Sequence, residues 1–377
     1  MRDHLYATFF ILLALILLLY STWCGIGLTY DSHDYLAAST SFALQGKLIN
    51  ATGTAFIMHA PFFPVFIAML GSNPIIKLKL LNLLFFCLTL IILYLTNYRF
   101  FKNRWFAHLG IFIIGFSVGH QMIYNFLWSE PLFLFFFALH NFFLIRFLNE
   151  KKKYDFWLMI LFAFMMCVTR NAGFFIIIPT TWILFTIISR SWRDPLLYFF
   201  ISALGFGMWN IYVLVAHNGM EAIYYSNEFF NSMWINSTNY LDVMSRWIFP
   251  VFVPLFFRLI CLIICAVILG YVLYLKKIPK AAMPYFIQFG VYVMIMSIFL
   301  KVYMDDIERY LAMVYPGFII GLLLVLDQLS VKFNYKLKKI LFFCIVLWVS
   351  YLGIRSVHNV NMWHNSRCAV KITRAVD

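Results

Sequence analysis

The feature that most constrains this chain is a series of long apolar segments separated by short connections rich in lysine and arginine. About 20 apolar residues in a helix are enough to cross the hydrocarbon core of a bilayer. The chain is 64% hydrophobic and only 12% charged, and its mean hydropathy is +0.86. Water-soluble globular domains and disordered chains are both far more polar. The sequence therefore predicts an all-α polytopic membrane protein.

The apolar segments number eleven, so we expect about eleven transmembrane helices in a single domain over residues 1–377, with no separate soluble domain. The first segment lacks a small-residue cleavage site and is expected to remain as a membrane anchor. The segments are 5–24, 75–96, 106–122, 130–148, 156–170, 173–189, 195–215, 248–275, 282–302, 310–329 and 340–355.

The basic residues predict which side each connection occupies. Alternate connections carry clusters of lysine and arginine, which together with Arg2 hold 17 of the 29 basic residues. All clusters fall on the cytoplasmic side if the N-terminus is cytoplasmic, because cytoplasmic loops are enriched in positive charge. Ten of the 15 acids then fall on the opposite face. We predict a bacterial inner or plasma membrane protein whose chemistry lies on the extracytoplasmic face.

Two extracytoplasmic loops are long, 25–74 and 216–247. The first contains two short helix-like stretches, 34–44 and 61–70, and we expect them to be juxtamembrane helices. The second is rich in aromatic residues, and it either rests on the membrane surface or packs against the helices. The seven cysteines fall mostly inside apolar segments and do not suggest a disulfide framework or a zinc site. The formal charge of +14 comes without a nucleic-acid-binding signature.

The strongest candidate site follows the first apolar segment, in residues 30–36. Asp31 is placed to act as a general base on an acceptor hydroxyl. Asp34 lies one helical turn later, on nearly the same face. The simpler interpretation is that Asp31 caps a short helix. The two carboxylates are also candidate ligands for a divalent cation.

Four further groups share this side of the membrane. His59 precedes a proline-rich turn, and Glu130 lies between Ser129 and Pro131 at a helix start. Arg170 lies in a polar hinge between two apolar segments, where it either points into an aqueous cavity or snorkels to lipid headgroups. The fourth group, residues 301–310, holds Glu308, Arg309 and Tyr310 among charges that could simply neutralise one another.

Arginines suit a phosphate, because the guanidinium group can form two parallel hydrogen bonds. Carboxylates, arginines and aromatic loops on one face indicate a site for an anionic lipid-linked substrate and a hydroxyl acceptor.

The order of these motifs resembles the GT-C glycosyltransferases, near the bacterial branch of protein mannosyltransferases and aminoarabinose transferases. The resemblance covers about residues 5–330. It rests on these matches: Asp31-Ser32 with Tyr35-Leu36, Gly46, His59-Ala60-Pro61-Phe62-Phe63-Pro64, Ser129-Glu130-Pro131-Leu132-Phe133, Thr169-Arg170, and Glu308-Arg309-Tyr310-Leu311.

The resemblance implies a GT-C-like bundle that transfers a sugar from a polyprenyl-phosphate carrier to a glycan, lipid or protein acceptor. It implies that Asp31 is the general base or, as in some members, a metal ligand, and that Glu130 is the second acidic residue. Arg170 and Arg309 would face the donor phosphate, with His59, Glu308 and Tyr310 beside the substrate. Asp31 would then promote an inverting single displacement.

Two departures from the family pattern stand out. The soluble C-terminal domain of many members is not found in these residues, and the proline turn lacks a double proline. Three other functions stay open: a transporter or flippase of a lipid-linked or anionic substrate, an O-antigen ligase or polymerase, and a non-catalytic assembly partner.

Overall fold

The computed structural model describes residues 2–188, 192–216, 229–274, 282–299 and 304–376. Within these ranges every regular element is a helix, apart from two isolated β-bridges. A backbone inside a bilayer must satisfy its own hydrogen bonds, and a helix does so within one segment. The predicted all-α polytopic architecture is therefore confirmed.

Five described helices are long and apolar enough to cross a membrane. They are α1 (Arg2–Ser21), α4 (Pro74–Asn97), α7 (Glu130–Glu150), α10 (Arg193–Ala216) and α16 (Tyr335–Val376). Two bent pairs raise the number to seven if each pair is one span. These pairs are α5 (Trp105–Gly115) with α6 (Val118–Asn125), and α14 (Met304–Ala312) with α15 (Tyr315–Ser330).

By length and composition the described residues thus contain five to seven helices able to cross a membrane, compared with the eleven apolar segments in the full sequence. The difference comes from predicted segments that form shorter helices within the described residues. These are α8 (Lys153–Thr169), α9 (Phe174–Ile183) with the π-helical turn Leu184–Ile188, α12 (Leu255–Tyr274, described in part) and α13 (Met283–Phe299). Parts of the predicted segments 173–189, 248–275 and 282–302 lie outside the residues that are fully described.

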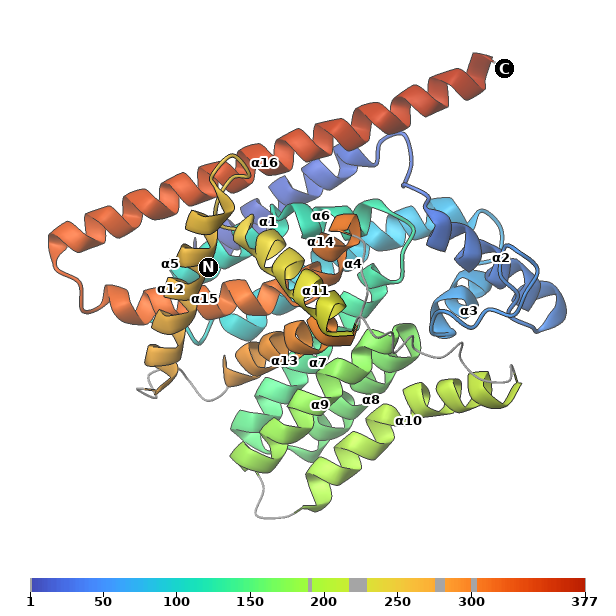
Figure 1. The fold of residues 1–377 in the computed structure, drawn as a ribbon, viewed down its shortest axis with the longest axis horizontal. Coiled ribbons are helices and arrows are strands. Elements are labelled where there is room, and N and C mark those ends of the chain that lie inside the picture. The colour runs from blue at the N-terminus through green and yellow to red at the C-terminus, as the bar shows by residue number, and fades with distance from the viewer. Residues whose placement is uncertain (1, 189–191, 217–228, 275–281, 300–303, 377) are drawn as a thin grey trace. The chain divides into compact units, whose positions relative to one another are not determined.

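Contacts divide the chain into two compact units. Unit 1 comprises residues 1–17, 93–122 and 227–361, and unit 2 comprises 18–92, 123–226 and 362–377. In unit 2, helices α7 to α10 pack as neighbours, drawn in green in Figure 1. Helix α7 ends where Lys151 adopts a left-handed conformation, with φ 55°, and the chain turns back into α8. A buried carboxylate, Asp155, pairs with Arg146 at 3.3 Å across this hairpin.

The first outer loop of unit 2 forms two short helices, α2 (Tyr30–Gln45) and α3 (Phe62–Met69). They pack against one another around Tyr35, Phe56 and Phe63, which are almost completely buried. The expectation of short helices in this loop is confirmed. Of the second long loop, residues 217–228 lie outside the described ranges, and α11 (Phe229–Ser245) forms the remainder.

Unit 1 is built around α15, which contacts α5, α12 and α13. A side chain at Gly321 would collide with the ring of Phe286, so the absence of a Cβ lets α13 approach α15 closely. Asp327 is fully buried, and its carboxylate accepts hydrogen bonds from the backbone N–H groups of Lys102 and Asn103 at 2.7 and 3.1 Å.

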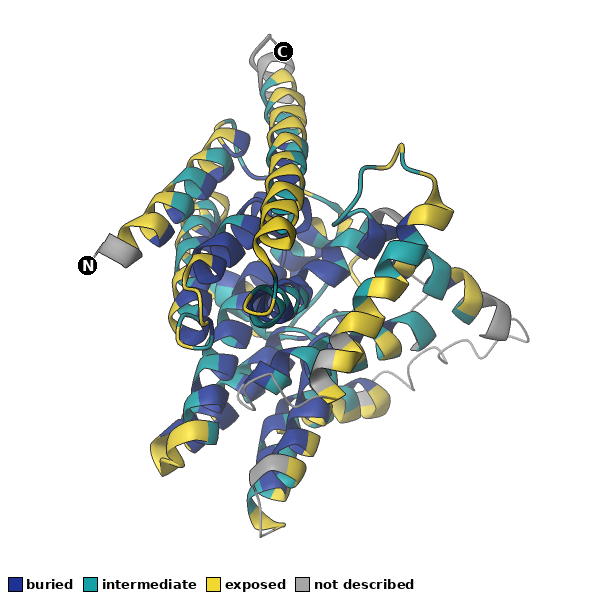
Figure 2. Ribbon diagram, turned by 90° about the vertical axis from the view of Figure 1, so that its left-hand side faces the viewer, coloured by how far each residue is buried: buried dark blue, intermediate teal, exposed yellow. Residues whose placement is uncertain are grey.

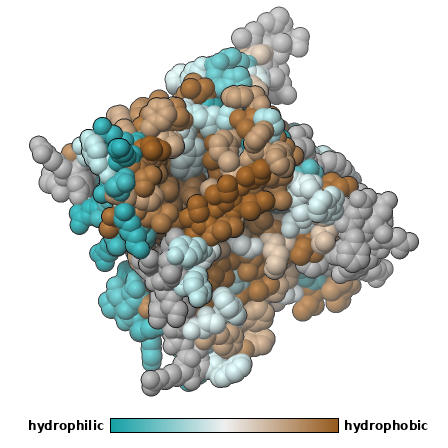
Figure 3. Space-filling view, turned by 60° about the vertical axis from the view of Figure 1, so that its left-hand side comes forward, coloured by the Kyte–Doolittle hydropathy of each residue, from teal (hydrophilic) through white to brown (hydrophobic). Residues whose placement is uncertain are grey.

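Large apolar side chains lie on the molecular surface. Figure 2 shows α16 largely exposed, and Figure 3 shows apolar residues gathered over one face. On α12 the exposed side chains include Phe256, Ile263 and Val267, each at least 62% exposed. Water-soluble proteins rarely expose apolar patches of this kind, whereas a helix surrounded by lipid exposes apolar side chains without a free-energy penalty. The chain is an integral membrane protein.

A disulfide joins Cys24, just beyond α1, to Cys368 in the last turns of α16. The cysteines therefore form this one described disulfide, although their positions in the sequence do not suggest a disulfide framework. The two residues are 344 positions apart, and only the tertiary fold brings their Cα atoms to 5.2 Å. The other five cysteines are free.

Candidate active site

Asp31 lies in the first turn of α2, where the helix N-terminus favours a negative charge. The simpler interpretation, in which Asp31 caps this helix, is wrong. That role belongs to Thr29 and Ser32, since the Ser32 hydroxyl accepts a hydrogen bond from the Thr29 backbone N–H at 2.9 Å. Asp31 Oδ1 lies 3.9 Å from His59 Nε2, and both side chains are about one-quarter exposed. The structure thus pairs two predicted site residues at a position that solvent reaches.

Asp34 has different surroundings. Its side chain is buried, and its Oδ1 accepts a hydrogen bond from the backbone N–H of Ala51 at 3.1 Å. The carboxylate therefore holds the turn at residues 50–54 against α2.

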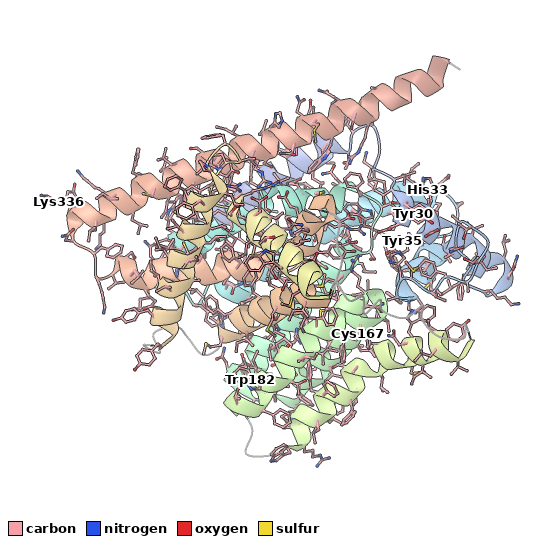
Figure 4. All side chains as sticks on the ribbon, in the orientation of Figure 1. Tyr30, His33, Tyr35, Cys167, Trp182 and Lys336 are labelled. Atoms are coloured by element: carbon pink, nitrogen blue, oxygen red, sulfur yellow. A yellow bond between two sulfur atoms is a disulfide. The ribbon has the colours of Figure 1, made fainter. Side chains whose placement is uncertain are left out.

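Tyr35 connects Asp31 and His59 to the interior of unit 2. Its ring centroid lies 5.1 Å from that of His59 and 4.9 Å from that of Phe63. Its hydroxyl lies 3.3 Å from Ser129 Oγ. Burial raises the pKa of Tyr35 well above its ordinary value, although Arg170 opposes the shift, so the phenol remains protonated and can donate a hydrogen bond. Figure 4 labels Tyr30, His33 and Tyr35, which all come from α2.

Glu130 and Arg170 form a buried ion pair at the other end of this network. Glu130 begins α7 with Pro131 behind it, as the sequence predicts, and its side chain is fully buried. Arg170 Nη1 lies 2.7 Å from Glu130 Oε1 and donates to Ser129 Oγ at 3.0 Å. The chain reverses directly after Arg170. A Cβ at Gly173 would lie 2.7 Å from backbone atoms of Met166 and Cys167, so only glycine fits this turn.

The structure therefore brings Asp31, His59, Glu130 and Arg170 into one network of unit 2, linked by Tyr35 and Ser129. Sequence reasoning quoted Tyr35 and Ser129 only as parts of motifs and gave neither a role. In the sequence these two residues are only a tyrosine and a serine near predicted acids. The fold shows that they connect the Asp31–His59 pair to the Glu130–Arg170 pair.

Glu308, Arg309 and Tyr310 belong to α14, in unit 1. Glu308 accepts two hydrogen bonds from Arg355 Nη2, at 2.9 and 3.0 Å. The Arg309 guanidinium is buried, lies 3.8 Å from Asp306 and is 5.9 Å from the ring centroid of Tyr310. Arg355 was not singled out in the sequence, where it appears only as the last residue of an apolar segment. A common site for this group and the network of unit 2 stays a prediction.

A second charge cluster in unit 1 consists of the buried Asp242 and Arg258 and the partly exposed Arg246. Asp242 Oδ1 lies 2.8 Å from Arg258 Nη1, and its Oδ2 is hydrogen-bonded to Arg246. Arg258 also donates to Ser245 Oγ at 2.7 Å. Its position inside an apolar segment was the one signal of this cluster in the sequence, because arginine within a membrane segment requires a partner.

The surroundings of Asp31 do not form a metal site by the usual donor count. The described residues contain no group of three or more His, Cys, Asp or Glu side chains placed to hold an ion. Asp34, the second candidate ligand, is engaged by the backbone of Ala51.

The architecture is a polytopic helical membrane fold with short helices in the loop after its first span. It is similar to the crystal structure of ArnT from Cupriavidus metallidurans bound to undecaprenyl phosphate. The TM-score is 0.57 and the sequence identity 13%, over 85% of this chain and 60% of that one. The apo structure of the same ArnT gives a TM-score of 0.56 at 13% identity, over 87% of this chain and 60% of that one.

This chain thus spans about 60% of the length of the solved structures it matches. No protein-family model and no curated protein sequence matches it. The likeness therefore establishes the fold, and the chemistry has to be argued from the residues.

Proposed function

We propose that this protein is a glycosyltransferase that moves a sugar from a polyprenyl-phosphate donor to an acceptor hydroxyl on the extracytoplasmic face. Two features support the donor class: the GT-C-like fold, and undecaprenyl phosphate bound to a protein of similar fold. The catalytic assignment rests on one observation: three carboxylates differ in their exposure and in the contacts they already make. The side chain of Asp31 is 24% exposed, whereas Asp34 and Glu130 are buried and already engaged.

In the proposed reaction Asp31 accepts the proton of the acceptor hydroxyl as its oxygen attacks the anomeric carbon. The bond from that carbon to the phosphate oxygen breaks in the same displacement, so the configuration inverts. His59, 3.9 Å from the carboxylate, helps to hold Asp31 in place. The leaving polyprenyl phosphate gains negative charge, which a prepositioned guanidinium stabilises best where water is scarce.

Arg170 and Arg309 are the proposed phosphate ligands. Arg170 is compensated by Glu130, so a phosphate would share this guanidinium with the carboxylate. Arg309 is buried with its carboxylate partner Asp306 3.8 Å away, a longer and weaker pairing. His59, Glu308 and Tyr310 complete the proposed donor-binding set.

The disulfide supports the proposed side of the membrane. Disulfides persist in oxidising compartments outside the cytosol and are rare within it. Cys24 follows the first span and Cys368 follows the apolar part of α16, so both fall on the face assigned as extracytoplasmic by the basic loops. Asp31 lies seven residues after Cys24, on the same face.

Substitution of Asp31 tests the proposal directly. We expect Asp31→Asn to lower transfer by about 10²- to 10⁴-fold, because the amide cannot accept the proton. The assay uses purified protein in detergent with a radiolabelled polyprenyl-phosphate sugar. Glu150→Gln is the matched control, since it removes one carboxylate from the exposed end of α7, away from the proposed site. Near-normal transfer by purified Asp31→Asn would remove Asp31 from the mechanism.

The second candidate function is transport of a lipid-linked or anionic substrate. The bent pairs α5–α6 and α14–α15, with angles of 50° and 61°, favour it, because transporters use broken helices at their binding sites. The same assay separates the two. A new covalent product formed in detergent indicates an enzyme, whereas activity that requires a sealed vesicle and forms no product indicates a transporter.

A further inference from the structure

Three side chains on the last turns of α16 face the outer end of the first span. Arg367 and Cys368 follow His364 by three and four residues, so both lie on the same side of the helix as His364. All three belong to unit 2, like the network around Asp31. We call them the strap.

Each strap residue makes a specific contact. Cys368 is bonded to Cys24. The ring of His364 stacks on Tyr20 with centroids 4.1 Å apart, and its Nδ1 lies 2.8 Å from the Tyr20 carbonyl oxygen. The contacts run from Tyr20, in the last turn of α1, to Cys24 beyond it, and they fix the direction in which the chain leaves the span.

Arg367 joins two chain segments. Its Nη1 donates to the Ser21 carbonyl at 2.8 Å and to Asn125 Oδ1 at 2.7 Å, and its guanidinium lies 5.0 Å from the Phe126 ring centroid. The other terminal nitrogen, Nη2, is buried and makes no hydrogen bond within the described part of the chain. A guanidinium can bridge two segments in this way because its donors have a fixed geometry.

The two segments that Arg367 joins are also paired with one another. Gly27 donates its N–H to the Asn125 carbonyl and accepts from the Leu127 N–H, both at 2.9 Å. Trp128 Nε1 donates to Thr29 Oγ1 at 2.7 Å. A side chain at position 27 would collide with the Phe126 ring, so glycine permits the close approach.

This paired stretch, residues 25–29 with 125–129, leads directly to the proposed active site. One segment continues to Asp31, and the other to Ser129 and Glu130. The Ser32 hydroxyl adds a hydrogen bond to the Leu127 carbonyl at 2.9 Å. The relative position of the two acids is therefore set by this stretch.

We propose that the strap positions the active site: Arg367 and the Cys24–Cys368 disulfide hold the paired stretch, and through it Asp31, in the geometry that transfer requires. The disulfide forms when the two thiols give up two electrons and two protons. A disulfide-bearing oxidoreductase of the extracytoplasmic compartment accepts the electrons and is reduced to its dithiol. Arg367 is a positioning residue and does not touch the substrate. This inference rests on the proposed function.

The test compares oxidised and reduced enzyme in the detergent assay. Reduction of wild-type protein with a phosphine should lower kcat by about 10- to 100-fold, since a displacement of about 1 Å has effects of this size. The KM for the lipid donor should change little. The Cys24→Ser/Cys368→Ser double variant should start at the reduced rate and not respond to the phosphine. Cys344→Ser, which removes an exposed free thiol, should behave as wild type.

Arg367 is tested with two variants. Arg367→Gln should lower kcat at unchanged KM, and Arg367→Lys should restore part of the rate because it keeps the charge but not the bridging geometry. A purely structural role would lower the amount of folded protein without changing kcat per folded molecule.

A second readout does not depend on activity. Hydrogen exchange of peptides covering 25–35 and 123–131 should accelerate on reduction, while peptides of α8 should not change. If reduced protein with alkylated Cys24 and Cys368 keeps both its kcat and its exchange rates, the strap proposal is wrong. If the oxidised protein transfers no sugar, but reduction still accelerates hydrogen exchange in peptides 25–35 and 123–131, the proposed function is wrong. The inference that the strap holds the paired stretch would then still be supported.

Discussion

The pair of Glu130 and Arg170 places two opposite charges in the interior of unit 2. Glu130 is fully buried and the Arg170 side chain is 11% exposed. Removing one partner of such a pair leaves an uncompensated charge, at a cost of roughly 3–5 kcal/mol. The pair therefore holds α7 and the turn after α8 together, whatever it contributes to catalysis.

We predict that Arg170→Gln lowers the thermal stability of the purified protein markedly. Lys152→Gln is the control, since Lys152 forms an exposed pair with Glu150 at 2.6 Å and such pairs contribute less than about 1 kcal/mol. Thermal unfolding in detergent measures both variants. Equal midpoints for the two variants would show that the buried pair adds nothing to stability.

At this scale the sequence predicts the individual site residues better than their partners. Asp31 and His59 were both expected at the outer face, and the fold places them 3.9 Å apart. The partners Glu130–Arg170, Glu308–Arg355 and Cys24–Cys368 were not predicted. A partner distant in sequence depends on helix packing, which hydropathy does not encode.

At the scale of elements, hydropathy locates the helices but not their breaks. Residues 106–122 read as one apolar segment, yet α5 and α6 meet at 50°. Gln121 Nε2 donates to the Gly115 carbonyl at 2.7 Å and to the Ala14 carbonyl at 3.1 Å. A polar side chain that satisfies the freed backbone makes such a break tolerable in a membrane. The sequence shows the glutamine but not the carbonyls it will meet.

The packing of α8 against α10 gives a prediction at this scale. A Cβ at Gly205 would lie 2.3 Å from Val168 Cγ1, whereas one at Gly207 meets nothing within 4 Å. We therefore expect Gly205→Val to separate these helices and lower the unfolding midpoint, because small residues allow close helix packing in membranes.

Gly207→Val is the matched control, with the same change in helix propensity two residues along the same helix. The comparison of the two midpoints isolates the packing contribution. If both variants unfold at the same temperature, the close approach of α8 and α10 is not what stabilises this part of unit 2.

For the molecule as a whole, the proposed orientation in the membrane rests on two independent physical arguments. Basic loops mark the cytoplasmic side through the energetics of insertion. The disulfide marks the opposite side through redox chemistry. Both arguments support the proposal that the first outer loop, and with it Asp31, lies outside the cytosol. The first argument comes from the sequence. The second comes from the fold, because the pairing of Cys24 with Cys368 is visible only in the folded chain.

Single cysteines in a background without the five free ones test this orientation. Thr52 lies at an exposed turn of the first outer loop, and Lys152 lies in the exposed basic connection between α7 and α8. We expect a membrane-impermeant maleimide to label Thr52→Cys in intact cells and to label Lys152→Cys only after permeabilisation. Retention of the native disulfide keeps Cys24 and Cys368 unreactive. The reverse pattern would place Asp31 in the cytosol, where the disulfide would not persist and no lipid-linked donor on the outer face could reach it.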